Sequence, residues 1–204
     1  MGDIYFVRHA ESDIRVHDEF LRPLTEKGLR DSALITNYLK DKDISYIYSS
    51  PYIRAVDTVK ELADELNISI TSIDHFKERR ISSWIDDFDS FSKRQWNDFD
   101  YSLADGECLK EVQIRNVTAL MELVQSHPEA NCVIGSHGTA LSTIINHFNP
   151  HFGFEGFSKI KALMPWIVKI TFEHQNFIKM ESIDVFKDNE ITPINLEKSE
   201  LANK

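Results

Sequence analysis

The sequence predicts an α/β fold, a three-layer α/β/α sandwich with a mostly parallel central sheet and an inserted helical cap. Two observations support this prediction. Short runs rich in β-branched and aromatic residues alternate with longer segments whose apolar residues recur at helical spacing. One segment, at about 76–105, interrupts this alternation with an aperiodic, aromatic and acidic stretch. We therefore expect a single domain over residues 1–204, with the cap inserted at about 76–105.

The first half of the chain predicts three strands and two helices. The strands are expected at 3–7, 44–50 and 68–73. Thr25 can cap the first helix, and apolar residues then recur at helical spacing: Ala33, Leu34, Tyr38 and Leu39. Pro51 suits the first turn of the second helix. We assign the buried face of that helix to Ala55, Val59, Leu62, Ala63 and Leu66.

The second half predicts two more helices and three more strands. A long helix is expected from about Glu107, with an apolar stripe formed by Val117, Leu120, Met121 and Val124. A buried strand at 131–136 runs directly into a helix at 138–148. The runs 166–173 and 177–186 predict a hairpin that turns across Glu173–Asn176. The polar C-terminal residues are expected to fray.

Composition limits the classes of partner and the compartment. The formal net charge of -10 argues against nucleic acids and anionic membranes as partners, because both require a basic face. No stretch reaches transmembrane length, and the N-terminus lacks the pattern of a signal peptide. The two cysteines, Cys108 and Cys132, form no metal-binding motif, so we expect reduced thiols and place Cys132 in the core. These features predict a cytoplasmic protein and leave a homo-oligomer open.

Basic and titratable residues follow three of the predicted strands. The first strand ends in Arg8-His9, the second is followed by Arg54 in "SSPYIRAVDT", and 131–136 ends in "SHG" with His137. Because parallel strands end at one edge of a sheet, these side chains are expected to converge at the start of a helix. Two arginines, two histidines and a helix N-terminus form a site suited to a phosphoryl group.

Each of these residues also has a structural interpretation when it is taken alone. A histidine at a strand end is commonly a hydrogen-bonded structural residue, and an arginine at a helix start commonly forms a surface ion pair. The combination favours the functional interpretation, since four such residues without an anion would repel one another.

Four motifs, in this order, carry a resemblance to a known family: "VRHAES", "LTEKG", "YSSPYIRAVDT" and "SHG". From residue 4 to about residue 148 the chain resembles the histidine phosphatase superfamily, also called the phosphoglycerate mutase-like family. The resemblance implies the three-layer fold, His9 as the nucleophile, and a phosphate pocket of Arg8, Arg54 and His137. It implies that Glu78, in "FKERRIS", is the acid. "DGECLKEV" resembles the family's Gly-Glu-Ser helix start, with Cys108 in the Ser position.

The chain departs from the family pattern at several positions. Ala10 replaces a usual Gly, which is acceptable where the backbone does not need a positive φ. Arg15 stands where the mutases carry an Asn that helps to bind the phosphoryl group, and we include it among the phosphate-binding candidates. Asp31 replaces a common Gln. The extra substrate-binding segment of the mutases is not recognisable, which favours hydrolysis over mutase activity.

The prediction is a metal-independent phosphomonoester hydrolase that works through a phosphohistidine on His9, with Glu78 as general acid and base and His137 also catalytic. We expect no cofactor and a phosphorylated small molecule as substrate. One alternative is cofactor-dependent transfer of the phosphoglycerate mutase type, and another is a catalytically silent module that binds a phospho-ligand. Glu78 could instead pair with Arg79 or Arg80 at the surface, in which case Glu107 is the reserve candidate for the acid.

The predicted cap would influence the choice of substrate. Its aromatic residues could face a ligand, although such residues more commonly pack on the body of the domain: Trp84, Phe88, Phe91, Trp96 and Phe99. The acidic residues Asp86, Asp87 and Asp89 would repel polyanions unless they point to solvent. For Glu11 we favour a structural role at a helix N-terminus.

Overall fold

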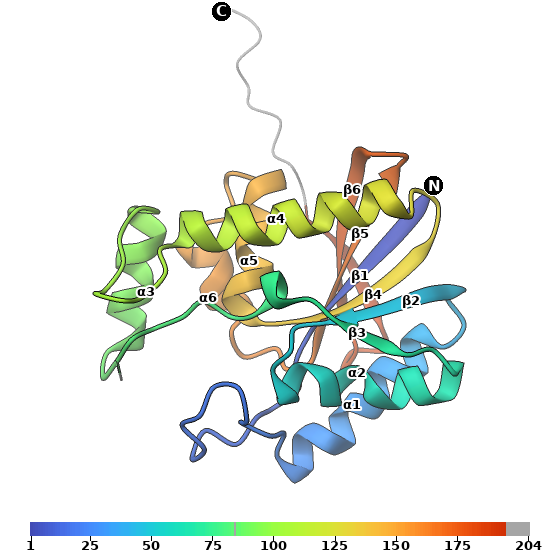
Figure 1. Ribbon diagram of the computed structural model, residues 1–204, viewed down its shortest axis with the longest axis horizontal. Helices are drawn as coiled ribbons and strands as arrows, with labels where there is room; N and C mark the ends of the chain where they lie inside the picture. Colours follow the sequence, from blue (N-terminus) through green and yellow to red (C-terminus); the bar gives the residue numbers. More distant parts are fainter. Residues whose placement is uncertain (84, 195–204) are drawn as a thin grey trace, which may run out of the picture.

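The computed structural model describes residues 1–83 and 85–194, whose strands form a seven-stranded sheet in the order β3-β2-β4-β1-β5-β6-β7 (Figure 1). The strands are β1 Gly2–Arg8, β2 Ile44–Ser49, β3 Ile70–Ser72, β4 Asn131–Ser136, β5 Trp166–Glu173, β6 Asn176–Asp184 and β7 Glu190–Pro193. The helices are α1 Glu26–Leu39, α2 Ile53–Leu66, the short 3₁₀ helix η1 Asp74–Phe76, α3 Phe88–Asn97, α4 Leu109–Ser126, α5 Gly138–Phe148 and α6 Phe154–Ile160.

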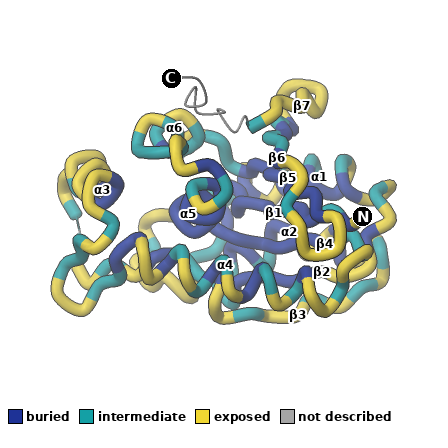
Figure 2. The backbone as a smooth tube through the Cα atoms, turned by 90° about the horizontal axis from the view of Figure 1, so that it is seen from above, coloured by how far each residue is buried: buried dark blue, intermediate teal, exposed yellow. Residues whose placement is uncertain are grey.

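Helices cover both faces of the sheet, as the three-layer prediction requires. Alternate residues of β1 point to opposite faces: Ile4 and Phe6 join one apolar cluster, and Tyr5 and Val7 join the other. The first cluster includes residues of α4 and α5, and the second includes residues of α1 and α2. Figure 1 shows the strands with α4 and α5 on one side and α1 and α2 on the other, and in Figure 2 the central strands are coloured as buried. The α/β sandwich predicted from the alternating pattern is therefore confirmed.

The sheet is mixed rather than mostly parallel, and this detail of the prediction needs correction. The pairs β3–β2, β2–β4 and β4–β1 are parallel, whereas β1–β5, β5–β6 and β6–β7 are antiparallel. The strands of the parallel half are joined by helical crossovers. In the antiparallel half, β5 returns beside β1, and turns then connect β5 to β6 and β6 to β7. The predicted hairpin is present, with Glu173 paired to Asn176.

Most predicted elements lie where the periodicity placed them, and the differences are local. The second helix begins at Ile53 rather than at Pro51, and Thr25 caps α1 by accepting a hydrogen bond from the Gly28 N–H. The buried residues of α1 are Gly28, Ser32, Ile35, Thr36 and Leu39. Of the apolar residues predicted at helical spacing in this helix, only Leu39 is among them. The structure adds α6 and β7, which the sequence analysis did not predict.

The segment 76–105 contains helix α3, which lies beside α6 (Figure 1). Trp96 is buried. The centre of its ring lies 5.5 Å from that of Phe99, 6.0 Å from that of Phe152 and 5.8 Å from that of Phe157. This part of the aromatic cap packs on the body of the domain, as expected. The acidic residues Asp86, Asp87 and Asp89 are exposed, and Asp89 pairs with Lys161.

Two expectations concern residues outside the described ranges: the orientation of Trp84 and the fraying of the C-terminal residues 195–204. Within the described residues, none of the helices combines the length and the apolar character needed to cross a membrane.

Candidate active site

The carboxyl ends of β1, β2 and β4 lie level with one another. In the sheet register Arg8 is opposite Ser136, and Ser49 is opposite Gly135. The chain continues the pairing one residue further, where the His9 N–H donates to Ser136 O at 3.0 Å and the Ser50 N–H to Gly135 O at 2.8 Å. His9, Ser50 and His137 therefore follow three adjacent strands at the same edge.

Arg8 is buried at the end of β1. Its Nη1 donates to Ile160 O at 2.7 Å and to Leu163 O at 3.2 Å. A Cβ on Gly138 would lie only 3.1 Å from the Arg8 guanidinium, so the absence of a side chain there lets the cation approach the N-terminus of α5. Burial lowers the pKa of Arg8 to about 10, so it is a cation at neutral pH.

His9 is held as a neutral ring with a defined tautomer. Its Nδ1 lies 2.7 Å from Ala10 O, and since a carbonyl can only accept, the proton is on Nδ1 and the lone pair on Nε2. Burial, together with the charges of Arg54 and Arg8, keeps the pKa of His9 well below its ordinary value. Ala10 does not have a positive φ, so the backbone conformation tolerates its methyl group.

Arg54 lies in the first turn of α2 and is almost fully buried. Its Nη1 donates to Glu19 O at 2.6 Å, and its Nη2 pairs with the Glu19 carboxylate at 2.9 Å. The guanidinium carbon lies 4.9 Å from the centre of the Tyr52 ring. Burial lowers the pKa of Arg54, and Glu19 opposes this shift. A carboxylate therefore contacts the cation that the sequence assigned to phosphate.

His137 is the N-cap residue of α5 and is fully buried. Its Nε2 lies 2.7 Å from Ser50 Oγ, and its ring centre is 5.3 Å from that of His9. Burial, then the charge of Arg54, lowers the pKa of His137 well below its ordinary value. The two imidazoles are thus neutral neighbours flanked by cations.

Three buried nitrogen atoms at this edge of the sheet lack a partner among the described residues: Arg8 Nε, Arg54 Nε and His137 Nδ1. Buried polar nitrogens are normally hydrogen-bonded, and an unpaired one implies a partner that the protein chain does not supply. All three belong to residues that influence the pKa of His9 or lie next to its ring. An oxyanion in front of His9 would provide acceptors for them.

Glu78 lies at the N-terminus of α5. Its carboxylate oxygens accept hydrogen bonds from the N–H groups of Thr139 at 3.0 Å and Ala140 at 3.1 Å. Its charge also raises the pKa of both Arg8 and Arg54, which places it in the same electrostatic environment. The backbone donors of this helix were expected to bind phosphate, whereas two of them bind Glu78.

The alternative of a surface ion pair for Glu78 is not what the structure shows. Arg79 is buried, where its guanidinium binds Gln95 and lies against the rings of Phe88 and Phe91, and it reaches Glu78 only through its backbone N–H at 2.7 Å. Arg80 is exposed, and its N–H donates to Glu107.

The other acidic candidates have structural partners. The carboxylate of Glu107 is paired with Arg115 at 2.8 Å. Burial of Glu107 favours its protonated form, but the hydrogen bonds from Arg115 and Arg80 outweigh burial and lower its pKa. Glu11 accepts a hydrogen bond from Oγ1 of Thr25 at the N-terminus of α1, in agreement with the structural role expected for it.

The structure does not bring Arg15 to this group. Its side chain is 88% exposed and forms a bidentate pair with Asp13 at 2.7 and 2.8 Å. The phosphate-binding assignment rested only on alignment with a mutase Asn. In this chain a carboxylate two residues away satisfies the guanidinium instead.

Four residues that were not predicted also contact the site: Ser50, Tyr52, Glu19 and Arg22. Tyr52 packs edge-on against His137 at 5.1 Å, and Arg22 holds the Glu19 carboxylate at 2.6 Å. Ser50 and Tyr52 lie in "YSSPYIRAVDT", so that motif contained a signal for both. The loop that carries Glu19 and Arg22 has no period from which a contact with Arg54 could be predicted.

Comparison with known proteins identifies the family of this chain. The family model for the histidine phosphatase superfamily (branch 1) matches residues 4–183. The chain belongs to the histidine phosphatase superfamily. Among curated relatives, the probable phosphoglycerate mutase GpmB of Yersinia pestis is 25% identical over 159 residues, which cover 72% of this chain and 74% of that protein.

Solved structures of other proteins share the fold. YhfR of Bacillus stearothermophilus superposes with a TM-score of 0.72 at 21% identity, covering 87% of this chain and 95% of that chain. A mycobacterial glucosyl-3-phosphoglycerate phosphatase with VO3 gives a TM-score of 0.71 at 17% identity, covering 88% and 96%. These similar proteins carry the names of a mutase and of a phosphatase.

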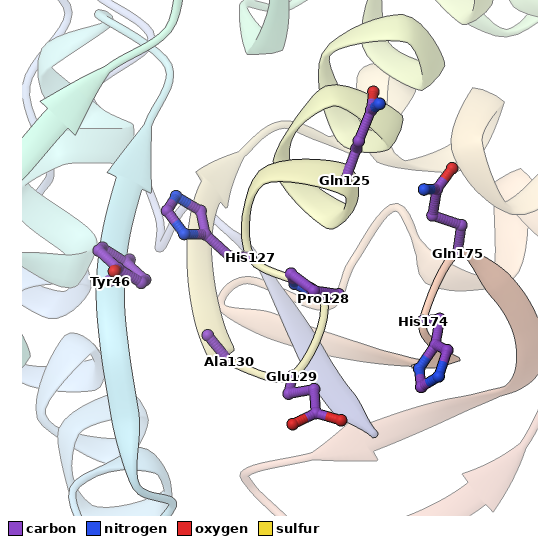
Figure 3. Close-up of a pocket in the computed structure, with 8 residues that line it drawn as sticks. All are labelled: Tyr46, Gln125, His127, Pro128, Glu129, Ala130, His174 and Gln175. Atoms are coloured by element: carbon purple, nitrogen blue, oxygen red, sulfur yellow. The ribbon is translucent and has the colours of Figure 1, made fainter.

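A separate surface depression of about 550 Å³ lies at the opposite end of the sheet (Figure 3). Its lining includes Tyr46, His127 and Ala130, next to the first residue of β4, and the turn of the β5–β6 hairpin. It is therefore not part of the site at the carboxyl ends of the strands. Among the described residues, no cluster of three or more His, Cys, Asp or Glu side chains is arranged to hold a metal ion.

Proposed function

We propose that this protein is a phosphomonoester hydrolase that works through a phosphohistidine on His9. The observation that carries the proposal is the set of three unpaired buried nitrogens, from Arg8, Arg54 and His137, around a neutral imidazole. Arginines arranged around a phosphoryl group stabilise the charge on its equatorial oxygens, which is the main task in phosphoryl transfer.

In the first step the Nε2 lone pair of His9 attacks phosphorus, and the bond from phosphorus to the ester oxygen breaks. Nε2 is free for this attack because the proton is on Nδ1, where Ala10 O holds it. Glu78, in its protonated form, donates a proton to the leaving oxygen. If the Ser50 hydroxyl donates to Nε2 of His137, the Nδ1–H of that ring can donate to a phosphoryl oxygen.

In the second step a water molecule attacks the phosphohistidine, and the P–N bond breaks. Glu78, now a carboxylate, accepts a proton from the water, and inorganic phosphate leaves with His9 neutral again. The N–H groups of Thr139 and Ala140 bind the Glu78 carboxylate and hold it at the N-terminus of α5.

The test is covalent trapping with a phosphate-labelled monoester. The protein should acquire a label that is stable in base and labile in acid, and H9A should abolish it. Labelling that survives in H9A would overturn the assignment. Tight phosphate binding with no turnover across a broad panel of phosphomonoesters would instead indicate a binding module.

The proposed substrate is a phosphorylated small molecule. One solved relative is a phosphoserine phosphatase from Entamoeba histolytica in complex with 3-phosphoglyceric acid, and another is the glucosyl-3-phosphoglycerate phosphatase. Both names describe small phosphate esters. A screen of phosphorylated metabolites in the presence of a chelator would identify the preferred ester and test the independence from metal ions.

Mutase activity is the second candidate, because the curated relative carries that name. Incubation with 3-phosphoglycerate and a trace of its bisphosphate separates the two activities. Release of inorganic phosphate supports the hydrolase, and exchange between phosphoglycerate isomers supports the mutase.

A further inference from the structure

The segment that carries Glu78 has little regular structure of its own. It follows the 3₁₀ helix η1, and residues 77–83 form neither a helix nor a strand. A general acid must be held close to the leaving oxygen, and a displacement of about 1 Å can cost on the order of a hundredfold in rate. The position of Glu78 therefore has to come from contacts with other elements.

Arg115, on α4, supplies the main contacts to this segment. Its Nη1 donates to His75 O at 2.6 Å and to Lys77 O at 2.8 Å, and its Nη2 lies 3.2 Å from Glu78 O. The planar guanidinium thus gathers three backbone carbonyls from four consecutive residues. Its side chain is only 13% exposed; the bonds to Lys77 O and Glu78 O are partly buried, and the bond to His75 O lies at the surface.

Glu107 fixes the guanidinium and binds the other side of the segment. Its Oε1 pairs with Nε of Arg115 at 2.8 Å, and its Oε2 accepts the Arg80 N–H at 2.8 Å. The Glu107 N–H donates in turn to Arg80 O at 2.9 Å. The chain is therefore held before and after Glu78 by a single ion pair.

The carboxylate of Glu78 accepts the N–H of the adjacent Arg79, and from outside its own segment it is held by the first turn of α5. Helices α4 and α5 are connected through Gln113, whose amide donates to Thr143 O and to Asn146 Oδ1, both at 2.9 Å. One helix thus sets the backbone of Glu78 and its neighbour sets the carboxylate.

We propose that Arg115, paired with Glu107, is a positioning residue that places Glu78 for proton transfer in phosphoryl transfer to His9. This inference rests on the proposed role of Glu78 as the acid. Arg115 is not assigned any contact with the substrate. Its effect should therefore be largest where the reaction depends most on the acid.

The leaving group provides the test. An alkyl phosphate such as glycerol 2-phosphate expels a basic alkoxide that needs a proton, whereas p-nitrophenyl phosphate expels a stable phenolate that needs little help. The measured quantity is kcat/KM, which covers only the steps up to loss of the leaving group. E78Q should lower it by roughly 10²- to 10⁴-fold for the alkyl ester and far less for the aryl ester.

R115Q should show the same selectivity with a smaller loss, up to about a hundredfold for the alkyl ester. Inhibition by inorganic phosphate should change less than about twofold, because the phosphate-binding side chains remain. In the double variant E78Q/R115Q, the second change should add little to the first, as expected for residues that act as a unit. Equal losses on both esters, or full additivity, would overturn the proposal.

R115K separates positioning from a direct effect of charge on the pocket. Lysine keeps the charge but cannot hold three carbonyls with a planar fork. Positioning predicts that R115K still shows the selective loss, and a purely electrostatic effect predicts that R115K is normal, which would contradict the proposal. R30Q, at an exposed arginine on α1, is the matched control and should leave both esters unaffected.

Thermal unfolding of each variant identifies a loss of folding. If R115Q is unfolded at the assay temperature, E107Q takes its place and should show the same selectivity. If E78Q itself affects both esters equally, Glu78 is not the acid, and the proposed mechanism fails before the question of its positioning arises. A selective E78Q with a non-selective R115Q leaves the mechanism intact and refutes the role of Arg115 alone.

Discussion

Arg54 shows how the charge of one residue is balanced without a substrate. It is almost fully buried, and a buried cation without a partner is costly. Glu19 supplies the negative charge through its carboxylate and is itself held by Arg22. A phosphoryl oxygen that binds Arg54 must therefore compete with Glu19 or share the guanidinium with it.

Replacement of Glu19 by glutamine tests this competition. E19Q keeps the shape and one acceptor oxygen but removes the charge, so inorganic phosphate should bind more tightly. The expected gain is roughly three- to tenfold, because the Glu19 side chain is 51% exposed and its charge is partly screened. The dissociation constant can be measured by isothermal titration calorimetry.

E61Q is the matched control for Glu19. Glu61 is exposed on α2, the helix that carries Arg54, so its change alters the net charge equally without touching the guanidinium. If E19Q binds phosphate no more tightly than E61Q does, Glu19 is not a competitor for Arg54.

At the scale of elements, one aromatic cluster attaches α3 to the rest of the domain. Trp96 contacts rings from α6 and from the loop after α5, while Gln95 binds Tyr101 O and Glu107 O at 2.9 and 3.1 Å. The rest of α3 is mostly exposed. The position of this helix therefore depends on a few side chains.

W96A should detach α3 from α6. Loss of a buried tryptophan typically lowers stability by about 3–5 kcal/mol. In this protein the loss would lower either the free energy of local opening of α3 or the free energy of global unfolding. We expect a lower melting temperature and faster proteolytic cleavage between residues 85 and 105. F88A is the control, since Phe88 is 39% exposed and its loss should matter less. Similar effects of the two changes would show that the Trp96 cluster does not hold the helix.

At the scale of the whole molecule, a locally positive site sits in a chain with a net charge of -10. Burial, together with the charges of Arg54 and Arg8, keeps the pKa values of His9 and His137 well below the ordinary value, so both rings are neutral. This arrangement favours an anion in the site and also links the stability of the fold to pH.

Stability should fall as the pH drops below 6.5. In the unfolded chain each histidine takes up a proton near that pH, whereas His9 and His137 have pKa values well below it in the folded protein. The unfolded state then binds more protons, so each residue costs up to about 1.4 kcal/mol of unfolding free energy per pH unit. Urea unfolding at pH 7.5, 6.5 and 5.5 measures this slope.

The double variant H9N/H137N removes both titrating groups, so its stability should depend less on pH over this range. The half-buried His147, whose pKa is also lowered by burial, remains in both proteins and supplies part of the residual slope. Equal slopes for the parent and the double variant would contradict the assignment of the pH dependence to the site.

The sequence by itself determined the layers, most of the helices and strands, and the meeting of Arg8, His9, Arg54 and His137. Periodicity reports which face of an element is buried, and residues that follow parallel strands share one edge of the sheet. Local signals of this kind do not depend on how distant loops fold. In the antiparallel half of the sheet, only the hairpin of β5 and β6 was predicted.

Only the tertiary structure decided which partners the charged side chains take. Arg15 pairs with a neighbour and stays outside the site, Glu19 contacts Arg54, and Arg115 holds the segment of Glu78. Long charged side chains can pair with any opposite charge or carbonyl within reach. That reach depends on backbone positions brought together from distant parts of the chain, which no local period encodes.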